Sequence, residues 1–399
     1  MAQRAPNFPL SGPLAPFEAG FTAHLVGLGY APNGIAGQRA LVAHLDRWLD
    51  AAGVTLAELP AVVERFLEAR AAAGYATKLT EHGLTPLLGY LERLGLYTRP
   101  APPATAVDEI VSRFHRHLIE ERGVGRATAG NYERVARRFL SERPEPLEAH
   151  LIELTAPDVT AFVVAHNDRL SVAAMQTVVQ GLRALLMFLY LAGVSSRPLA
   201  SAVPTVTRRR QELPRALPEE HLALLLQGCD RTTPVGSRDF AILTVLARLG
   251  LRADEVAHLE LDDIDWRAGE LRVRGKGPRI DKLPLPADVG DAVVEYLRHA
   301  RPTTPERRLF IRASAPRRGL SRQAVGGLVR AASVRAGLAP HGPHRLRHTV
   351  ATGLLRRGAP LAEIAQLLRH QSVQTTAIYA KVDLEALSSL TQPWPEAVE

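Results

Sequence analysis

The stretch GELRVRGKGPRIDKLPLP, residues 269–286, contains the signals of two short strands and the turn that joins them. The segments before and after the turn GKGP, residues 275–278, have the composition of strands, and together they predict a β-hairpin. The run RLFI, residues 308–311, predicts one further strand. Because the predicted strands are few and short, the region around them is expected to be mainly α-helical with a small antiparallel sheet.

Helical segments flank the hairpin on both sides, as judged from the spacing of their apolar residues. They are predicted at residues 218–229, 237–250, 288–300, 321–337, 343–358 and 360–370. Most of the core of this region is therefore expected to come from helices.

Two proline-rich segments divide the chain into three parts. Thr98–Ala106 and Pro204–Glu220 are typical of extended linkers, because proline lacks a backbone N–H and restricts the residue before it. The parts before and between them have apolar stripes at helical spacing, as in residues 41–49. The predicted domains are an N-terminal helical domain of uncertain role at 1–100, a second helical domain at 105–205 and a third domain at 215–399.

The composition is that of a globular protein and excludes a disordered tail or a disulfide scaffold. The chain has 399 residues, of which 46% are hydrophobic and 23% charged. The single cysteine, Cys229, cannot form an internal disulfide or a cysteine-based zinc site. Prolines interrupt the N-terminus where a secretion signal needs an apolar core, and the apolar run Ala184–Val194 is too short to span a bilayer. A cytoplasmic protein with no membrane partner is expected.

The positive charge is concentrated near the C-terminus. The chain carries a net charge of +8, whereas residues 301–399 contain 15 basic and 6 acidic residues and so carry +9 (15 − 6), which leaves −1 for residues 1–300 (8 − 9). Such a basic region favours a polyanionic partner, most often nucleic acid. A solubilising surface is the alternative on charge alone.

Lysine is rare in this chain, because arginine supplies almost all of the 49 basic residues. The four lysines are Lys78, Lys276, Lys282 and Lys381. Each lysine therefore calls for a chemical explanation, above all Lys276 in the predicted hairpin turn.

Four segments of the third domain form an ordered set. They are RLGLRADEVAHL (248–259), RVRGKGPRIDKLPLP (272–286), HGPHRLRHTVAT (341–352) and LLRHQSVQTTAIYAKVD (367–383). The order is an arginine, a lysine in a Gly-Lys-Gly turn, the motif His-x-x-Arg, and a histidine nine residues before a tyrosine. In this order and spacing the segments resemble the tyrosine recombinase (phage integrase) family, over nearly all of the third domain.

The resemblance implies a fold and a set of roles. It implies N-terminal helical (SAM-like) DNA-binding domains, of which 105–205 is a core-binding DNA clamp, before a mainly α catalytic domain with a small antiparallel sheet. It implies a site-specific recombinase that acts on double-stranded DNA carrying a specific recombination site, with four protomers on paired sites. The implied catalytic residues are Arg252, Lys276, His344, Arg347, His370 and Tyr379.

The chemistry of a phosphodiester gives a physical reason for the two arginines. Attack on the phosphorus builds negative charge on the non-bridging oxygens, and a guanidinium can bind these oxygens in a bidentate way while staying charged at any useful pH. Arg252 and Arg347 are the candidates. Glu255, three residues after Arg252, is expected to orient a cation, because a free carboxylate would repel phosphate.

Proton transfer explains the lysine and the histidines. Cleavage has to protonate a departing 5′ oxygen, which lysine can do when its pKa is lowered and arginine cannot. Lys276 is the candidate general acid, and Lys282 on the next strand is its rival. His344 and His370 are expected to donate hydrogen bonds to the phosphate or to shuttle the proton.

Tyr379 is the candidate nucleophile. A free phenol has a pKa near ~10, so it needs neighbouring cations or a base. A covalent phosphotyrosine keeps the energy of the broken bond, so no ATP, metal or other cofactor is expected. His344 and His348 have the i, i+4 spacing of some zinc ligands, but Arg347 between them disfavours a metal.

One residue departs from the family's pattern. The family usually has Leu-Gly-His where this chain has Leu368-Arg369-His370. Glycine there would permit a helix end with positive φ. Arginine either adopts that conformation at some cost or the turn differs, and a contact with phosphate is one role expected for its side chain. This departure affects the placement of His370.

The tail Asp383–Gln392 has an apolar stripe behind an acidic start. The resemblance implies that it docks on a neighbouring protomer, and docking on its own domain is an equal alternative. Two other functions share the same motifs: a DNA-relaxing enzyme like the type IB topoisomerases, and a non-catalytic DNA-binding protein of the same fold.

Overall fold

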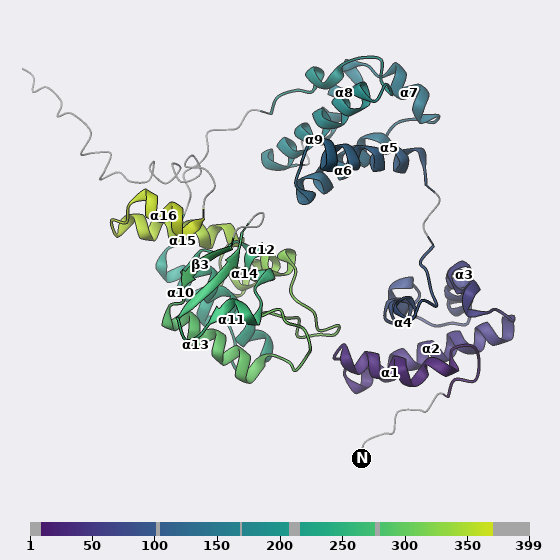
Figure 1. Cartoon of the computed structure of the whole chain (residues 1–399), viewed down its shortest axis with the longest axis horizontal. Helices are drawn as coiled ribbons and strands as arrows, with labels where there is room; N and C mark the ends of the chain where they lie inside the picture. Colours follow the sequence, from purple (N-terminus) through teal and green to yellow (C-terminus); the bar gives the residue numbers. More distant parts are fainter. Residues whose placement is uncertain (1–8, 101–103, 168–169, 207–215, 276–279, 370–399) are drawn as a thin grey trace, which may run out of the picture. The chain divides into compact units, whose positions relative to one another are not determined.

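The computed structural model describes residues 9–100, 104–167, 170–206, 216–275 and 280–369 (Figure 1). The chain divides into two compact units, one formed by Met1–Thr98 with Glu212–Glu399 and the other by Arg99–Gln211. The main clusters of buried apolar side chains lie separately within residues 14–97, 110–203 and 217–346. The predicted division into three domains stays a prediction.

The segment before the first proline-rich joint is helical, as predicted. Its α-helices are α1 (Glu18–Gly27), α2 (Pro32–Ala52), α3 (Leu59–Ala72) and α4 (Glu81–Arg93). Asp46 on α2 is fully buried, and its carboxylate accepts hydrogen bonds from the backbone N–H groups of Ser11, Gly12 and Leu14 at 2.7–3.0 Å. These bonds satisfy buried backbone donors and fix the residues that lead into α1.

The described residues of the second unit form a bundle of five α-helices (Figure 1). They are α5 (Ala106–Arg116), α6 (Arg126–Ser141), α7 (Leu147–Glu153), α8 (Ala156–Asn167) and α9 (Val172–Leu191). Thr105 caps α5 in a capping box with Asp108, which agrees with a boundary between the proline-rich joint and the bundle.

Helix α9 contains one window, Ala174–Leu191, that is long and apolar enough to cross a membrane, and half of that window is buried inside the protein. One face of the helix, with Leu182 and Leu185 fully buried, packs into the core of the bundle. Arg183 on the same helix donates hydrogen bonds to the carbonyl oxygens of Val203 and Pro204. We therefore assign α9 as a core helix of the bundle.

The C-terminal part contains a three-stranded antiparallel sheet in the order β1-β2-β3. Its strands are β1 (Ile264–Asp265), β2 (Glu270–Arg274) and β3 (Ile280–Pro284). The hairpin β2–β3 confirms the prediction from residues 269–286, with Leu271 opposite Leu283 and both buried. The short strand β1 was not predicted.

The prediction of a strand at residues 308–311 is wrong. Arg308 bridges to Glu260 and Ile311 to Gly319, and these are isolated bridges to different partners rather than a ladder. The three consecutive residues 309–311 are all buried, so this segment lacks the alternation of a half-buried strand.

The described residues of the C-terminal part form seven α-helices besides the sheet, and each corresponds to a predicted or motif-bearing segment. They are α10 (Glu219–Gln227), α11 (Pro234–Leu249), α12 (Ala253–His258), α13 (Ala287–Glu295), α14 (Arg322–Arg335), α15 (Pro343–Arg356) and α16 (Leu361–Leu368). Helix α11 is the central one and packs against α10, α12, α13, α14 and α15. Cys229, just after α10, is a buried core residue, and burial raises the pKa of its thiol.

Gly250 brings the end of α11 close to the end of α16. It caps α11 with φ +59°, and a Cβ at this position would lie 2.8 Å from Cδ2 of the fully buried Leu368. Glycine is required here both by the left-handed backbone and by the close approach.

We expect Gly250→Ala to lower the free energy of unfolding of the C-terminal part by more than the matched change Gly269→Ala. Both residues have positive φ, but a Cβ at Gly269 would meet open space. Each change costs about 1–2 kcal/mol for the left-handed backbone, and Gly250→Ala costs roughly 1 kcal/mol more because Leu368 has to move. Native-state hydrogen exchange of α11 peptides in urea, read by mass spectrometry, measures both losses. Equal losses would show that the close approach of Gly250 to Leu368 does not add to the cost of the substitution.

Candidate functional site

Three of the six predicted catalytic residues lie in the part of the chain that the structure describes, and these three converge. Arg252 is the N-cap residue of α12, whereas His344 and Arg347 lie on α15. Lys276, His370 and Tyr379 lie outside the described residues.

Arg252 is held by Glu255 and by the end of α16. Its Nη1 donates a hydrogen bond of 2.7 Å to Oε1 of Glu255, and its backbone N–H donates one of 2.8 Å to Oε2 of the same carboxylate. Its Nη2 donates to the backbone carbonyl of Arg369 at 3.3 Å. The Arg252 side chain stays 35% exposed, so it is oriented from behind while it still faces solvent.

Arg347 is anchored at the same place from the other side. Its side chain is buried, its Nη1 donates a hydrogen bond of 2.6 Å to the carbonyl of Gly250, and its Nη2 donates to the carbonyl of Leu368. Unpaired carbonyls at a helix C-terminus carry partial negative charge and attract cations. The ends of α11 and α16 therefore hold the two predicted phosphate-binding arginines side by side.

His344 lies within the electrostatic reach of both arginines. Desolvation by neighbouring protein atoms, followed by the positive charges of Arg347, Arg322 and Arg252, lowers the pKa of its imidazole below 6.5. Desolvation and the charges of His344, Arg347 and Arg345 lower the pKa of His348 as well. Both imidazoles are therefore neutral at neutral pH, and a neutral His344 can still donate one hydrogen bond to a phosphate oxygen.

The i, i+4 spacing of His344 and His348 raises the question of a metal site. Across the described ranges, no three His, Cys, Asp or Glu side chains lie close enough together to hold a metal ion. The positive charge of Arg347, which lowers the pKa of both histidines, would also repel a bound cation.

Glu255 links Arg252 to a residue whose position the sequence analysis did not explain. Arg369 donates a hydrogen bond of 2.6 Å from Nη2 to Oε2 of Glu255, and the two side chains are 3% and 5% exposed. Arg369 thus adopts the left-handed conformation, with φ +54°, but its buried side chain contacts Glu255 instead of facing a phosphate. Burial raises the pKa of Glu255, but the charge of Arg369 and the hydrogen bonds from both arginines lower it by more than burial raises it. The carboxylate is therefore ionised.

Lys282, the rival of Lys276 as general acid, is paired with an acidic residue. Its Nζ donates a hydrogen bond of 2.8 Å to Oε2 of Glu270 on β2, and this bond raises its pKa. A raised pKa holds the proton more tightly, which is the opposite of what a general acid needs.

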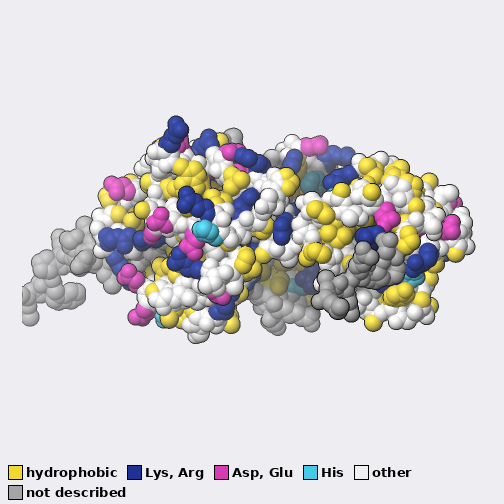
Figure 2. Space-filling view, turned by 90° about the horizontal axis from the view of Figure 1, so that it is seen from below, with side chains coloured by type: hydrophobic (Ala, Val, Ile, Leu, Met, Phe, Trp, Pro, Cys, Tyr) yellow, Lys and Arg dark blue, Asp and Glu magenta, His cyan; other side chains and the backbone are white. Residues whose placement is uncertain are grey.

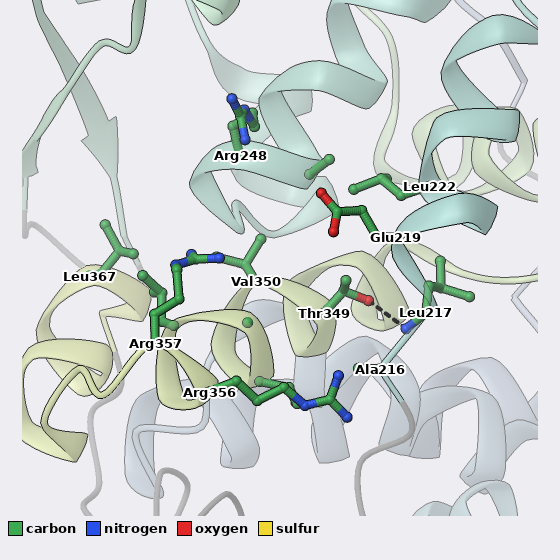
Figure 3. Close-up of a pocket in the computed structure, with 14 residues that line it drawn as sticks. Ala216, Leu217, Glu219, Leu222, Arg248, Thr349, Val350, Arg356, Arg357 and Leu367 are labelled. Atoms are coloured by element: carbon green, nitrogen blue, oxygen red, sulfur yellow. Dashed lines mark hydrogen bonds between the residues drawn. The ribbon is translucent and has the colours of Figure 1, made fainter.

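A cavity of about 310 Å³ lies between α10, α11, α15 and α16 (Figure 3). Apolar side chains including Leu222, Val350 and Leu367 line it, together with three basic residues and one acidic one, which are Arg248, Arg356, Arg357 and Glu219 (Figure 3). The cavity therefore combines an apolar wall with positive charge.

We expect the free energy of unfolding of α15 to fall as the pH decreases from 7.5 to 5.5. The pKa values of His344 and His348 are lowered in the folded state, so the unfolded chain binds more protons once the pH falls below about 6.5. His348→Gln should make this pH dependence shallower. Hydrogen exchange of α15 peptides in urea, at both pH values, measures it. An unchanged slope in the variant would contradict a neutral, half-buried His348.

Two sequence comparisons show which family the chain belongs to. Residues 215–385 match the phage integrase family. The chain is 40% identical to integrase/recombinase y4rA of Sinorhizobium fredii (strain NBRC 101917 / NGR234), over 97% of this chain and 96% of that protein. It is 35% identical to the tyrosine recombinase XerD of Mycobacterium tuberculosis (strain ATCC 25618 / H37Rv), over 68% of this chain and 92% of XerD.

A comparison of structures supports the fold. The crystal structure of the XerH site-specific recombinase bound to palindromic difH substrate, a post-cleavage complex, aligns with a TM-score of 0.53 at 20% sequence identity. The alignment covers 86% of this chain and 97% of that chain. The mainly α fold with a small antiparallel sheet is confirmed, and the chain belongs to the phage integrase family of tyrosine recombinases, enzymes that cleave and rejoin DNA.

Proposed function

We propose that this protein is a site-specific recombinase that binds double-stranded DNA and cuts it with Tyr379 as the nucleophile. The observation that carries the proposal is the convergence of Arg252, His344 and Arg347, with both guanidinium groups anchored on the ends of α11 and α16. Two fixed cations and a neutral hydrogen-bond donor suit the charge that develops on a phosphate under attack.

The proposed reaction exchanges one phosphodiester for another. The phenol of Tyr379 gives up its proton to a neighbouring base while its oxygen attacks the scissile phosphorus, and the bond from phosphorus to the 5′ oxygen breaks. The products are a 3′-phosphotyrosyl link and a free 5′ hydroxyl, which receives its proton from Lys276. The 5′ hydroxyl of a partner duplex then attacks the phosphotyrosine, which completes strand exchange and releases Tyr379. The number of phosphodiester bonds stays constant, so the exchange needs no ATP.

Double-stranded DNA is the proposed partner. The XerH structure that this fold resembles contains its difH substrate, and the net charge of +8 favours a polyanion. Figure 2 shows basic side chains spread over the visible face with acidic ones among them, so the proposal rests on the arginine site more than on a single basic patch. We place the protein in the cytoplasm, where its DNA substrate would lie.

We further propose that four protomers act together on two DNA sites. The tail Asp383–Gln392, outside the described residues, has an acidic start and an apolar stripe. The cavity beside α15 offers an apolar wall with Arg356 and Arg357, which suits such a segment. A tail from a neighbouring protomer would link subunits on DNA, whereas a protomer's own tail would close its own domain.

We expect Tyr379→Phe to form no detectable covalent adduct with a nicked DNA substrate that carries the recombination site, while the DNA dissociation constant changes less than about threefold. The phenyl ring keeps the shape but lacks the attacking oxygen. Tyr190→Phe, on the exposed face of α9, is the matched control and should cleave like the wild type. The site is found first by sequencing DNA trapped covalently on the wild-type protein in its native cell, and adducts are then counted on denaturing gels.

The other outcomes separate the alternatives. An adduct that survives in Tyr379→Phe would refute the nucleophile assignment. Cleavage whose ends rejoin only their own duplex, even with a second duplex present, would indicate a relaxing enzyme. Wild-type binding without any cleavage would indicate a non-catalytic DNA-binding protein.

A further inference from the structure

Arg369 occupies a position where an arginine is costly. It caps α16 with φ +54° and ψ +48°, a conformation that glycine adopts freely and other residues adopt at a cost of roughly 1–2 kcal/mol. The residue is also 5% exposed, although a guanidinium is strongly hydrated in water. Something in the folded protein must therefore compensate for both the backbone conformation and the burial.

Hydrogen bonds to Arg252 and its neighbours provide this compensation. The Arg369 guanidinium donates to Oε2 of Glu255 at 2.6 Å and to the carbonyl of Leu367 at 2.9 Å. The backbone carbonyl of Arg369 in turn accepts the 3.3 Å hydrogen bond from Nη2 of Arg252. Side chain and backbone of one residue thus hold Arg252 by two routes, one direct and one through Glu255.

Arg369 also changes the net charge around Arg252. Glu255 carries one negative charge and lies between two guanidinium groups, with Oε1 on Arg252 and Oε2 shared by Arg369 and the backbone N–H of Arg252. Without Arg369, the negative charge of Glu255 would cancel the positive charge of Arg252. With it, the cluster of three groups keeps a net charge of +1 beside Arg347.

We propose that Arg369 is a positioning residue that orients Arg252 and shares the charge of Glu255, so that Arg252 keeps its attraction for the scissile phosphate. This inference rests on the proposed recombinase function and deepens it. In this role Arg369 contacts no DNA, and its guanidinium instead stays bonded to Glu255 and to the carbonyl of Leu367. Its contribution is expected in the rate of cleavage, where phosphate charge develops, and not in the affinity for DNA.

Three substitutions separate the parts of this role. Arg369→Met removes the charge and keeps a side chain of similar length in the same strained backbone. Arg369→Gly removes the charge and relieves the backbone, so it remains folded even if the methionine variant does not. Arg369→Lys keeps a charge beside Glu255. Arg298→Met, at an exposed site in the helical turn after α13, is the control for the loss of one positive charge from the same part of the chain.

The measurement is single-turnover cleavage of the nicked substrate, at a temperature well below unfolding, with the DNA dissociation constant measured in parallel. We expect the methionine and glycine variants to cleave about 10–100-fold more slowly at saturating protein, because a small misplacement of a binding group costs a rate of this order. The dissociation constants should stay within about threefold of the wild type. The lysine variant should recover most of the rate, and Arg298→Met should match the wild type.

A merely structural role would give a different result. It would lower the thermal stability of the methionine variant and leave the cleavage rate of the glycine variant at the wild-type value, and that outcome would overturn the proposal. Loss of DNA affinity with an unchanged saturating rate would also overturn it, because it would place Arg369 in DNA binding.

A double-mutant cycle with Glu255→Gln tests whether Arg369 acts on Arg252 through Glu255. If Arg369 acts through Glu255, the double variant loses less rate than the product of the two single losses. Multiplicative losses would refute the route through Glu255. A wild-type protein that forms no adduct would overturn the proposed function together with this inference, whereas wild-type cleavage with unaffected Arg369 variants overturns the inference alone.

Discussion

The site depends on one constraint, which is that the C-terminal ends of α11 and α16 meet. At this junction the carbonyls of Gly250, Leu368 and Arg369 accept hydrogen bonds from the two arginines predicted to bind phosphate. Gly250 permits the approach because a Cβ would lie 2.8 Å from the Leu368 side chain. The two guanidinium groups repel each other. They can lie together here because the partial negative charge of the helix-end carbonyls and the charge of one carboxylate offset their positive charge. The core of the C-terminal part keeps these two helix ends in place.

Local signals in the sequence are sufficient for most of the secondary structure of the C-terminal part. The hairpin at 269–286 is predicted from its turn and its strand composition, and its register places Leu271 opposite Leu283. The prediction of a strand at 308–311 is wrong because an apolar run can be a buried segment as well as a strand. The residues 309–311 are buried on every side, and composition alone cannot distinguish the two cases. The orientation of Arg252 by Glu255 is predictable, since the two lie three residues apart at the start of one helix.

The contact between Glu255 and Arg369 is not predictable, because 114 residues separate them and only the folded core brings them together. The one signal in the sequence is an arginine where the family has a glycine. That signal indicates an unusual helix end but cannot show whether the side chain faces DNA or the interior. The same reasoning applies to Lys282. The register of β2 and β3 places it opposite Arg272 and one diagonal position from Glu270, and its hydrogen bond to Glu270 argues against Lys282 as the general acid.

The central claim is that Arg252, His344 and Arg347 bind a single backbone phosphate while Arg369 stays behind them. The most direct measurement is a crystal structure of the protein on its DNA site, with orthovanadate in place of the scissile phosphate between Tyr379 and the 5′ hydroxyl. The account predicts that both arginine side chains and the His344 imidazole lie within hydrogen-bond distance of the vanadate oxygens, with Arg369 bonded to Glu255. Arginines that contact different phosphates, or a vanadate beyond the reach of Arg252, would contradict it.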